Sequence, residues 1–300
     1  MKYTFVLNFF LLIGIWVSFA HVMNGQIIVP VVAKEATNQD SEQADKVTLN
    51  SMHIVPDFDR ILESKQLKGS ILLFDQKDEQ YFSNDFQWAE IERLPASTFK
   101  IPNSIIALET GVMANDSTII PWNGEKRFLK SWEQDLSFRQ AFQLSCVPCY
   151  QEIARKIGVE RMKIYLDKLG YGGMEFDGET IDRFWLEGNS GISQMQQITF
   201  LKRFYDQQLP ISYGTYELIK KLMFVHKDYG YSLFGKTGMA ARDGSNNGWY
   251  VGFIEKEEQV IFFATNVIPT VDMSMETFGP LRISASVEAL NWILENRNKP

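Results

Sequence analysis

Residues 95–104 read PASTFKIPNS, and this stretch decides how the rest of the sequence is interpreted. Ser97 and Lys100 form the pattern S-x-x-K. A helix that begins near Ala96 places positions i and i+3 on one face, so the hydroxyl and the amine meet. The amide groups at the start of the helix favour an alkoxide and an oxyanion. The apolar residues that follow bury the amine, which lowers its pKa and makes it usable as a base. The stretch therefore predicts a serine nucleophile beside a lysine base.

The S-x-x-K pattern by itself occurs often by chance, and a capped helix with an exposed lysine is the simpler interpretation. Two further motifs strengthen the chemical one. Ser145-Cys146-Val147 lies in the helical middle of the chain, and Lys236-Thr237-Gly238 follows a run of strand-forming residues near the end. Their order and spacing are similar to those of the penicillin-recognising serine enzymes, in which S-x-x-K is followed by S-x-[VN] and K-[TS]-G.

The sequence resembles the class D, oxacillinase-type, serine β-lactamases over nearly the whole of residues 51–300. Val147 in the second motif and Phe184-Trp185-Leu186-Glu187 favour class D over class A. The matching segments are PASTFKIPNS (95–104), FQLSCVPCYQEIARKIG (142–158), YLDKLGYGG (165–173), DRFWLEG (182–188), FGKTG (234–238), NGWYVGFIE (247–255), FFATN (262–266) and GPLRISA (279–285). The resemblance implies hydrolysis of β-lactam antibiotics, resistance to them, and the serine β-lactamase/penicillin-binding-protein fold.

The resemblance also implies a role for each motif residue that carries the chemistry. Ser97 is the nucleophile that opens the β-lactam ring, and Lys100, carbamylated by CO₂ to N6-carboxylysine, is the general base. Trp185 donates a hydrogen bond to the carbamate, and Val147 keeps its pocket dry. Ser145 passes a proton to the leaving nitrogen. The protein then needs dissolved CO₂ or bicarbonate, but no metal ion and no other cofactor.

A second group of residues is expected to bind the substrate. Lys236 supports the electrostatic field near the nucleophile, while Thr237 and Arg282 bind the substrate carboxylate. Gly238 lies between Thr237 and Met239, whose N–H completes the oxyanion hole with that of the nucleophile. A strained cyclic amide that bears a carboxylate needs this combination of nucleophile, base, oxyanion hole and cationic clamp.

Two segments depart from the family pattern. Tyr171-Gly172-Gly173 stands where the family has Tyr-Gly-Asn, and Asn189-Ser190-Gly191 replaces a bulkier apolar or basic residue. These departures leave the substrate range open, including activity on carbapenems.

The order of predicted elements indicates an α+β domain. Segment 68–75 and segment 80–83 read as an antiparallel hairpin, and helical spacing dominates about 97–225, most clearly over 150–169. Three strands, at 229–237, 248–255 and 259–266, and a helix at 282–296 follow. We expect both ends of the domain to feed one antiparallel sheet, with a helical subdomain inserted between them.

The first residues have the composition of a secretory signal. A charged start precedes an apolar run, Phe5 to Ala20, which is shorter than a bilayer span and ends in small residues. We predict a cleaved signal peptide at 1–20, a flexible polar leader at 21–50 and the catalytic domain at 51–300. The expected location is the periplasm or the outside of a bacterium, with no membrane attachment after cleavage.

Composition excludes several other classes. The chain of 300 residues has 30 Lys and Arg against 37 Asp and Glu, and this acidic balance argues against nucleic-acid binding. Its three histidines form no metal-binding pattern. The run 230–237 matches the phosphate-binding loop GxxxxGK[ST], but its middle residues favour a strand and a turn follows, where that loop requires a helix.

Cys146 and Cys149 form a CxxC pattern without a preceding buried strand. They are packed thiols or a local disulfide, and neither has a chemical role in the mechanism above. The alternatives to a lactamase are a non-hydrolytic β-lactam sensor domain, a cell-wall peptidase or transpeptidase, and a thiol–disulfide protein using these cysteines. The sequence leaves the oligomeric state open, with a homodimer as one option.

Overall fold

The structure of the protein is a computed structural model that describes residues 22–23, 26–27, 51–228, 230–240 and 247–296. The chain divides into two compact units, Met1–Lys46 and Val47–Pro300. In the first unit, the described strands β1 (Val22–Met23) and β2 (Gln26–Ile27) pair in antiparallel fashion. The predicted signal peptide and nearly all of the predicted leader lie outside the described residues.

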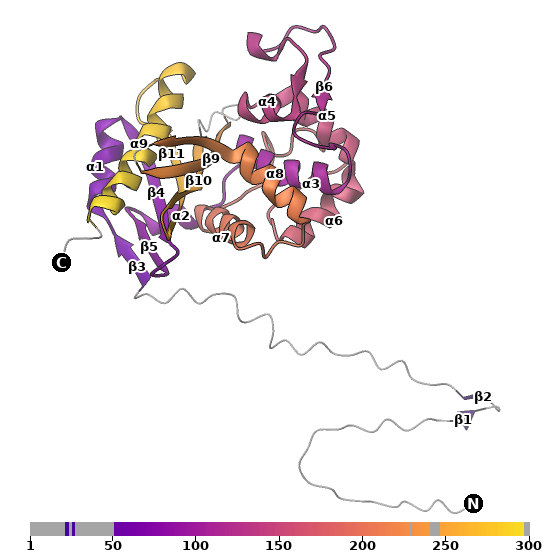
Figure 1. Cartoon of the computed structure of the whole chain (residues 1–300), viewed down its shortest axis with the longest axis horizontal. Helices are drawn as coiled ribbons and strands as arrows, with labels where there is room; N and C mark the ends of the chain where they lie inside the picture. Colours follow the sequence, from indigo (N-terminus) through magenta and orange to yellow (C-terminus); the bar gives the residue numbers. More distant parts are fainter. Residues whose placement is uncertain (1–21, 24–25, 28–50, 229, 241–246, 297–300) are drawn as a thin grey trace, which may run out of the picture. The chain divides into compact units, whose positions relative to one another are not determined.

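A seven-stranded sheet forms the centre of the second unit, with strand order β3-β5-β4-β11-β10-β9-β8 (Figure 1). Its strands are β3 (Met52–Ile54), β4 (Leu67–Asp75), β5 (Gln80–Ser83), β8 (Phe224–Asp228), β9 (Tyr231–Ala240), β10 (Asn247–Lys256) and β11 (Gln259–Pro269). All neighbours pair antiparallel except β3 and β5, which are parallel. The pairing of β4 with β11 joins the two ends of the domain, as predicted.

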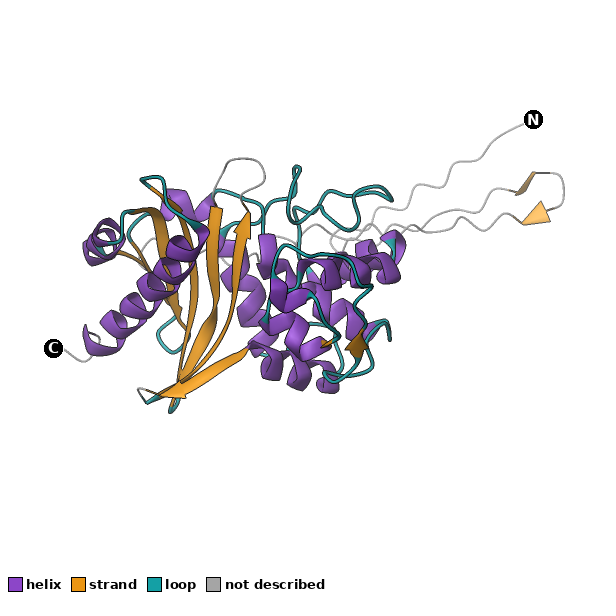
Figure 2. Ribbon diagram, turned by 90° about the horizontal axis from the view of Figure 1, so that it is seen from above, coloured by secondary structure: helices purple, strands orange, loops and turns teal. Residues whose placement is uncertain are grey.

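Helices cover both faces of this sheet (Figure 2). The short strands β6 (Ile119–Ile120) and β7 (Leu136–Ser137) form a separate pair within the helical part. The helices are α1 (Pro56–Ser64), α2 (Phe86–Glu90), the 3-10 helix η2 (Ala96–Phe99), α3 (Lys100–Glu109), the 3-10 helix η3 (Lys130–Trp132), α4 (Phe138–Gln143), α5 (Val147–Ile157), α6 (Val159–Leu169), α7 (Gln194–Tyr205), α8 (Tyr213–Met223) and α9 (Met275–Asn296). The α+β class with an inserted helical subdomain is therefore confirmed.

Alternating side chains of the central strands separate two hydrophobic cores. Leu72 and Phe74 of β4 pack with the inserted helices, whereas Ile71 and Leu73 of the same strand pack against α1 and α9. Side chains of a strand point alternately to opposite faces, so one apolar run serves both cores. The sheet is thus buried on both faces; β9 carries the Lys236-Thr237-Gly238 motif, and η2, which carries Ser97, packs against β9.

The helical boundaries differ from the sequence prediction in two places. The helical spacing over 150–169 belongs to α5 and α6, which are separated at Gly158, where the backbone takes a φ of 78°. A glycine adopts this left-handed conformation without steric cost, and so it ends one helix and begins the next. The helix at Ala96 begins as the 3-10 turn η2, in which residues i and i+3 eclipse each other more closely than in an α-helix.

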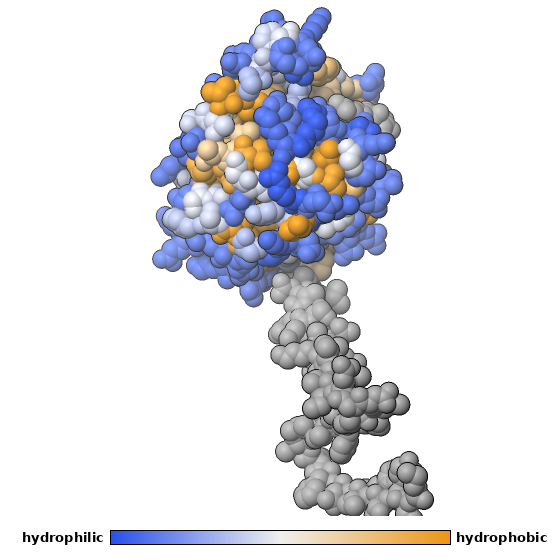
Figure 3. Space-filling view, turned by 90° about the vertical axis from the view of Figure 1, so that its right-hand side faces the viewer, coloured by the Kyte–Doolittle hydropathy of each residue, from blue (hydrophilic) through white to orange (hydrophobic). Residues whose placement is uncertain are grey.

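The side of the domain that carries the inserted helices shows small apolar patches among mostly hydrophilic residues (Figure 3). Within the described part of the chain, no helix has the length and apolar character needed to cross a membrane.

Candidate active site

The predicted nucleophile lies in a tightly held turn before α3. Ala96 has a left-handed φ of 50°, and its N–H donates to the carbonyl of Trp185 at 2.8 Å. On the other side, the N–H of Thr98 donates to the carbonyl of Pro95 at 3.1 Å. A non-glycine residue persists in a left-handed conformation where its surroundings hold it. These bonds aim Ser97, only 8% exposed, at the predicted base.

Lys100 is buried beneath the nucleophile. Its Nζ donates to Ser97 Oγ at 3.0 Å, and its side chain is 1% exposed. Burial, followed by the nearby charge of Lys236, lowers the pKa of Lys100 well below its ordinary value. The ring of Tyr150 lies 4.9 Å from Nζ. The S-x-x-K prediction is therefore met in geometry, and burial of the amine favours its neutral form.

Trp185 packs against Phe99, the residue that precedes this lysine. Its indole is fully buried and stacks on Phe99, with ring centroids 5.3 Å apart and planes 17° apart. Among the described residues, Trp185 Nε1 has no hydrogen-bond acceptor. A buried donor without a partner costs free energy, and tryptophan N–H groups usually find one. The orphaned N–H therefore marks a place for an additional acceptor.

A second hydroxyl–amine pair stands opposite the nucleophile. Lys236 on β9 donates to Ser145 Oγ at 2.5 Å and to the carbonyl of Thr237 at 3.0 Å. Burial lowers the pKa of Lys236 to about 7, with a smaller contribution from the charge of Arg282. Ser145 also has a left-handed backbone, with a φ of 54°. A lysine with this pKa exchanges a proton with a hydroxyl near neutral pH.

Arg282, the eighth residue of α9, supplies a cation to the same site. It is 7% exposed, and Nη1 contacts the sulfur of Met239 at 3.6 Å. Its Nε has no acceptor among the described residues. Burial lowers the pKa of Arg282 to about 10, so the guanidinium stays charged at neutral pH. A buried guanidinium with an unused N–H is suited to bind a carboxylate.

A cavity of about 560 Å³ connects these groups. The predicted site residues that line it are Ser97, Ser145, Val147, Thr237, Gly238, Met239 and Arg282. Lys100, Trp185 and Lys236 are not among the lining residues. Lys100 donates to Ser97 and Lys236 donates to Ser145, so each lysine reaches the cavity through a serine. A Cβ at Gly238 would stand 3.0 Å from the carbonyl of Pro95, so the glycine lets β9 approach the nucleophile turn.

The cavity is also lined by residues to which the sequence assigned no catalytic or substrate-binding role. They are Phe128, Leu129, Trp132, Pro148, Gln151, Leu186 and Met275. Phe128 is 83% exposed and Met275 46% exposed, so apolar surface faces solvent at the entrance. Their sequence signal is weak: Phe128 lies between short polar segments, and Met275 is the first residue of α9, outside the helix predicted at 282–296.

The two segments that depart from the family pattern meet in the structure. Gly191 donates its N–H to the carbonyl of Gly173 at 2.8 Å. Gly173 has a φ of 74°, and a Cβ there would lie 2.2 Å from the carbonyl oxygen of Gly191. The two departures from the family pattern are therefore related, because the absence of a side chain at Gly173 permits the close approach of Gly191.

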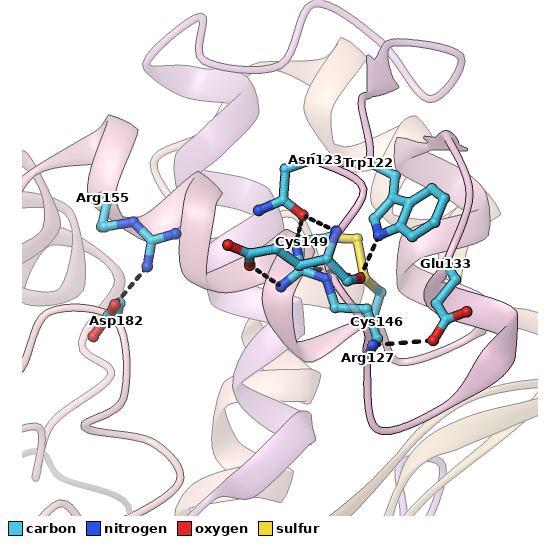
Figure 4. A network of polar contacts seen from close by, with 9 residues as sticks. Trp122, Asn123, Arg127, Glu133, Cys146, Cys149, Arg155 and Asp182 are labelled. Carbon is cyan, nitrogen blue, oxygen red and sulfur yellow. Dashed lines mark hydrogen bonds and ion pairs between the residues drawn. A yellow bond between two sulfur atoms is a disulfide. The ribbon is translucent and has the colours of Figure 1, made fainter.

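Cys146 and Cys149 form a disulfide at the start of α5 (Figure 4), which resolves the choice that the sequence left open. Cys146 is 1% and Cys149 8% exposed, so neither sulfur offers the accessible surface that thiol exchange requires. The phosphate-loop match is also excluded, since Gly235, Lys236 and Thr237 lie within strand β9.

Comparisons with known proteins agree with this geometry. Residues 65–277 match the penicillin binding protein transpeptidase domain. The chain is 40% identical to beta-lactamase OXA-10 of Pseudomonas aeruginosa over 224 residues, covering 74% of this chain and 82% of that protein. It is 38% identical to beta-lactamase OXA-48 of Klebsiella pneumoniae over 206 residues, covering 68% and 77%.

Solved structures show the same relationship. The class D β-lactamase YbXI from Nostoc superposes with a TM-score of 0.74 at 41% identity, covering 78% of this chain and 97% of that one. The class D β-lactamase of Sebaldella termitidis gives 0.76 at 33% identity, covering 81% and 98%. With the transpeptidase domain matched and relatives this similar over most of their length, the chain belongs to the class D serine β-lactamases, a family of hydrolases.

Proposed function

We propose that the protein hydrolyses β-lactam antibiotics through an acyl-enzyme on Ser97. The hydroxyl of Ser97 loses its proton to the base at Lys100 and attacks the lactam carbonyl, and the ring C–N bond breaks. Ser145, 2.5 Å from Lys236, lies opposite and is suited to give a proton to the departing nitrogen. Water then hydrolyses the ester and frees the serine.

The observation that carries this proposal is the orphaned indole N–H of Trp185, whose ring stacks on Phe99, the neighbour of Lys100 in the chain. Only a neutral amine adds CO₂, and burial of Lys100 favours the neutral form. The resulting carbamate is an anion that requires a donor in a dry site, which Trp185 Nε1 provides. When formed, the carbamate supplies the general base for acylation and for activation of the hydrolytic water.

Substrate binding rests on the cationic side of the cavity. The guanidinium of Arg282 and the hydroxyl of Thr237 lie at the same wall of the cavity and suit the carboxylate of a β-lactam. The N–H groups of Ser97 and Met239 are assigned to the oxyanion. The apolar rim, including Phe128 and Met275, fits the acyl side chain of a penicillin.

We further propose that the protein is exported and confers β-lactam resistance on its host. The predicted signal peptide gives the route. The Cys146–Cys149 disulfide supports the location, because disulfides persist in oxidising compartments such as the periplasm.

Turnover of a chromogenic cephalosporin by the purified mature protein tests the function. Sustained hydrolysis is expected, together with an acyl adduct on Ser97 visible by intact-protein mass spectrometry after acid quenching. A single stoichiometric burst would instead indicate a sensor or a transpeptidase. Loss of turnover after removal of bicarbonate, with recovery on its return, tests the base; unaffected turnover would refute the carbamate while leaving the serine route intact.

A further inference from the structure

The disulfide lies in the middle of the turn that brings three side chains to the site. Ser145, immediately before Cys146, contacts Lys236, and Val147, immediately after it, lines the cavity. Tyr150, next to Cys149, places its ring 4.9 Å from Nζ of Lys100. The disulfide is thus adjacent in the chain to Ser145, which contacts Lys236, and to Tyr150, which contacts Lys100.

This turn is conformationally demanding. Ser145 takes a φ of 54°, which an L-residue with a side chain disfavours. Its N–H donates to the carbonyl of Phe142 at 3.1 Å, and the N–H of Cys146 donates to that of Ala141 at 2.9 Å. These bonds to α4 hold the N-terminal side of the turn. Its C-terminal side depends on how Cys146 joins α5.

The disulfide fixes that junction. Cys146 is the N-cap residue of α5, and its sulfur accepts the N–H of Cys149 at 3.3 Å in addition to the covalent bond. Rotation of Cys146 therefore requires movement of the first turn of the helix. Further along α5, Arg155 pairs with Asp182 and ties the helix to the segment that contains Trp185 (Figure 4). The C-terminal side of the turn is therefore held by α5, through the disulfide.

We propose that the Cys146–Cys149 disulfide is a positioning device for catalysis, which holds Ser145 in the left-handed conformation that meets Lys236. The inference rests on the proposed function. Without the disulfide, Ser145 relaxes toward an ordinary backbone conformation, its hydroxyl leaves Lys236, and protonation of the departing nitrogen slows. Substrate binding through Arg282 and Thr237 is unchanged, because neither residue lies on this turn.

A double variant, Cys146→Ala with Cys149→Ala, tests the proposal on the mature protein with a chromogenic cephalosporin. The expected result is a kcat reduced about 10- to 100-fold, within the range of a misplaced proton-transfer group, with KM little changed. Ser212→Ala, which removes the N-cap hydroxyl of α8 and alters no residue that lines the cavity, is the matched control. It lowers the melting temperature and leaves the kcat of the folded enzyme unaltered.

Combination with Ser145→Ala separates positioning from general destabilisation. If the disulfide acts through Ser145, its loss has no further effect on kcat once that hydroxyl is absent. An equal loss of kcat in both backgrounds, or a kcat within about twofold of wild type, would overturn the proposal. If that chain does not fold, Cys146→Ser with Cys149→Ser, made with and without Ser145→Ala, provides the same comparison. Turnover by the wild type tests the proposed function, so failure of that function is distinguished from failure of the disulfide proposal.

Discussion

Replacement of Trp185 by phenylalanine is expected to weaken the binding of CO₂ at Lys100, and so to raise the bicarbonate concentration that turnover requires. The indole N–H is a buried donor without an acceptor among the described residues, and the substitution deletes it while keeping an aromatic ring on Phe99. A hydrogen bond to a charged group contributes about 1.5–3 kcal/mol. At about 1.4 kcal/mol for each factor of ten, the bicarbonate required for half-maximal turnover rises about 10- to 150-fold.

The substitution also costs stability. The indole is fully buried, and a cavity of about 40 Å³ at about 24 cal/mol per Å³ costs roughly 1 kcal/mol of unfolding free energy, in addition to the transfer free energy of the removed atoms. Trp249→Phe is the matched control, because Trp249 is equally buried but donates to the carbonyl of Leu94 at 2.9 Å. We expect both variants to lose stability and only the first to need more bicarbonate.

The assay is steady-state turnover of a penicillin over a bicarbonate series, with the acyl-enzyme followed by mass spectrometry. Low bicarbonate should trap the acyl-enzyme in the Trp185 variant, and ¹³C-labelled bicarbonate should give a weaker carbamate resonance than in wild type. Identical bicarbonate dependence for the wild type and the two tryptophan variants would refute the reasoning.

Three further predictions concern single positions. Ser97→Ala abolishes hydrolysis and acyl-adduct formation while the melting temperature stays near that of wild type, since alanine is a good helix former; turnover close to wild type would contradict the assignment. The pKa of Lys236 is about 7 in the folded protein against an ordinary 10.5, so the unfolded chain binds an extra proton between these values and stability rises with pH there. Lys236→Met should reduce that slope by up to about 1.4 kcal/mol per pH unit in urea unfolding at pH 7.5 to 9.5, and an unchanged slope argues against the lowered pKa. Gly173→Ala costs at least about 1–2 kcal/mol in the same assay, because of its positive φ and the carbonyl of Gly191, whereas Gly172→Ala, with open space around its Cα, should be nearly neutral; equal losses would exclude the clash.

The sequence by itself determined the elements whose signals are local. Runs of strand-forming residues bounded by turn residues predicted the hairpin of β4 and β5 and the strands β9, β10 and β11. The spacing of Ser97 and Lys100 predicted a shared helical face, since a turn of helix relates residues three apart whatever surrounds them. The spacing could not place the break between α5 and α6, because the apolar residues on both sides continue one helical pattern through Gly158.

The tertiary structure decided the features that depend on residues distant in sequence. No local pattern shows that Trp185 Nε1 lacks an acceptor, that Arg282 reaches Met239, or that Gly173 approaches Gly191. The left-handed turn at Ser145 depends on bonds to α4 and on the lysine of β9, which no helical propensity encodes. Local preferences are set within a turn of chain, whereas burial, orphaned donors and lowered pKa values arise only when separate elements exclude water together.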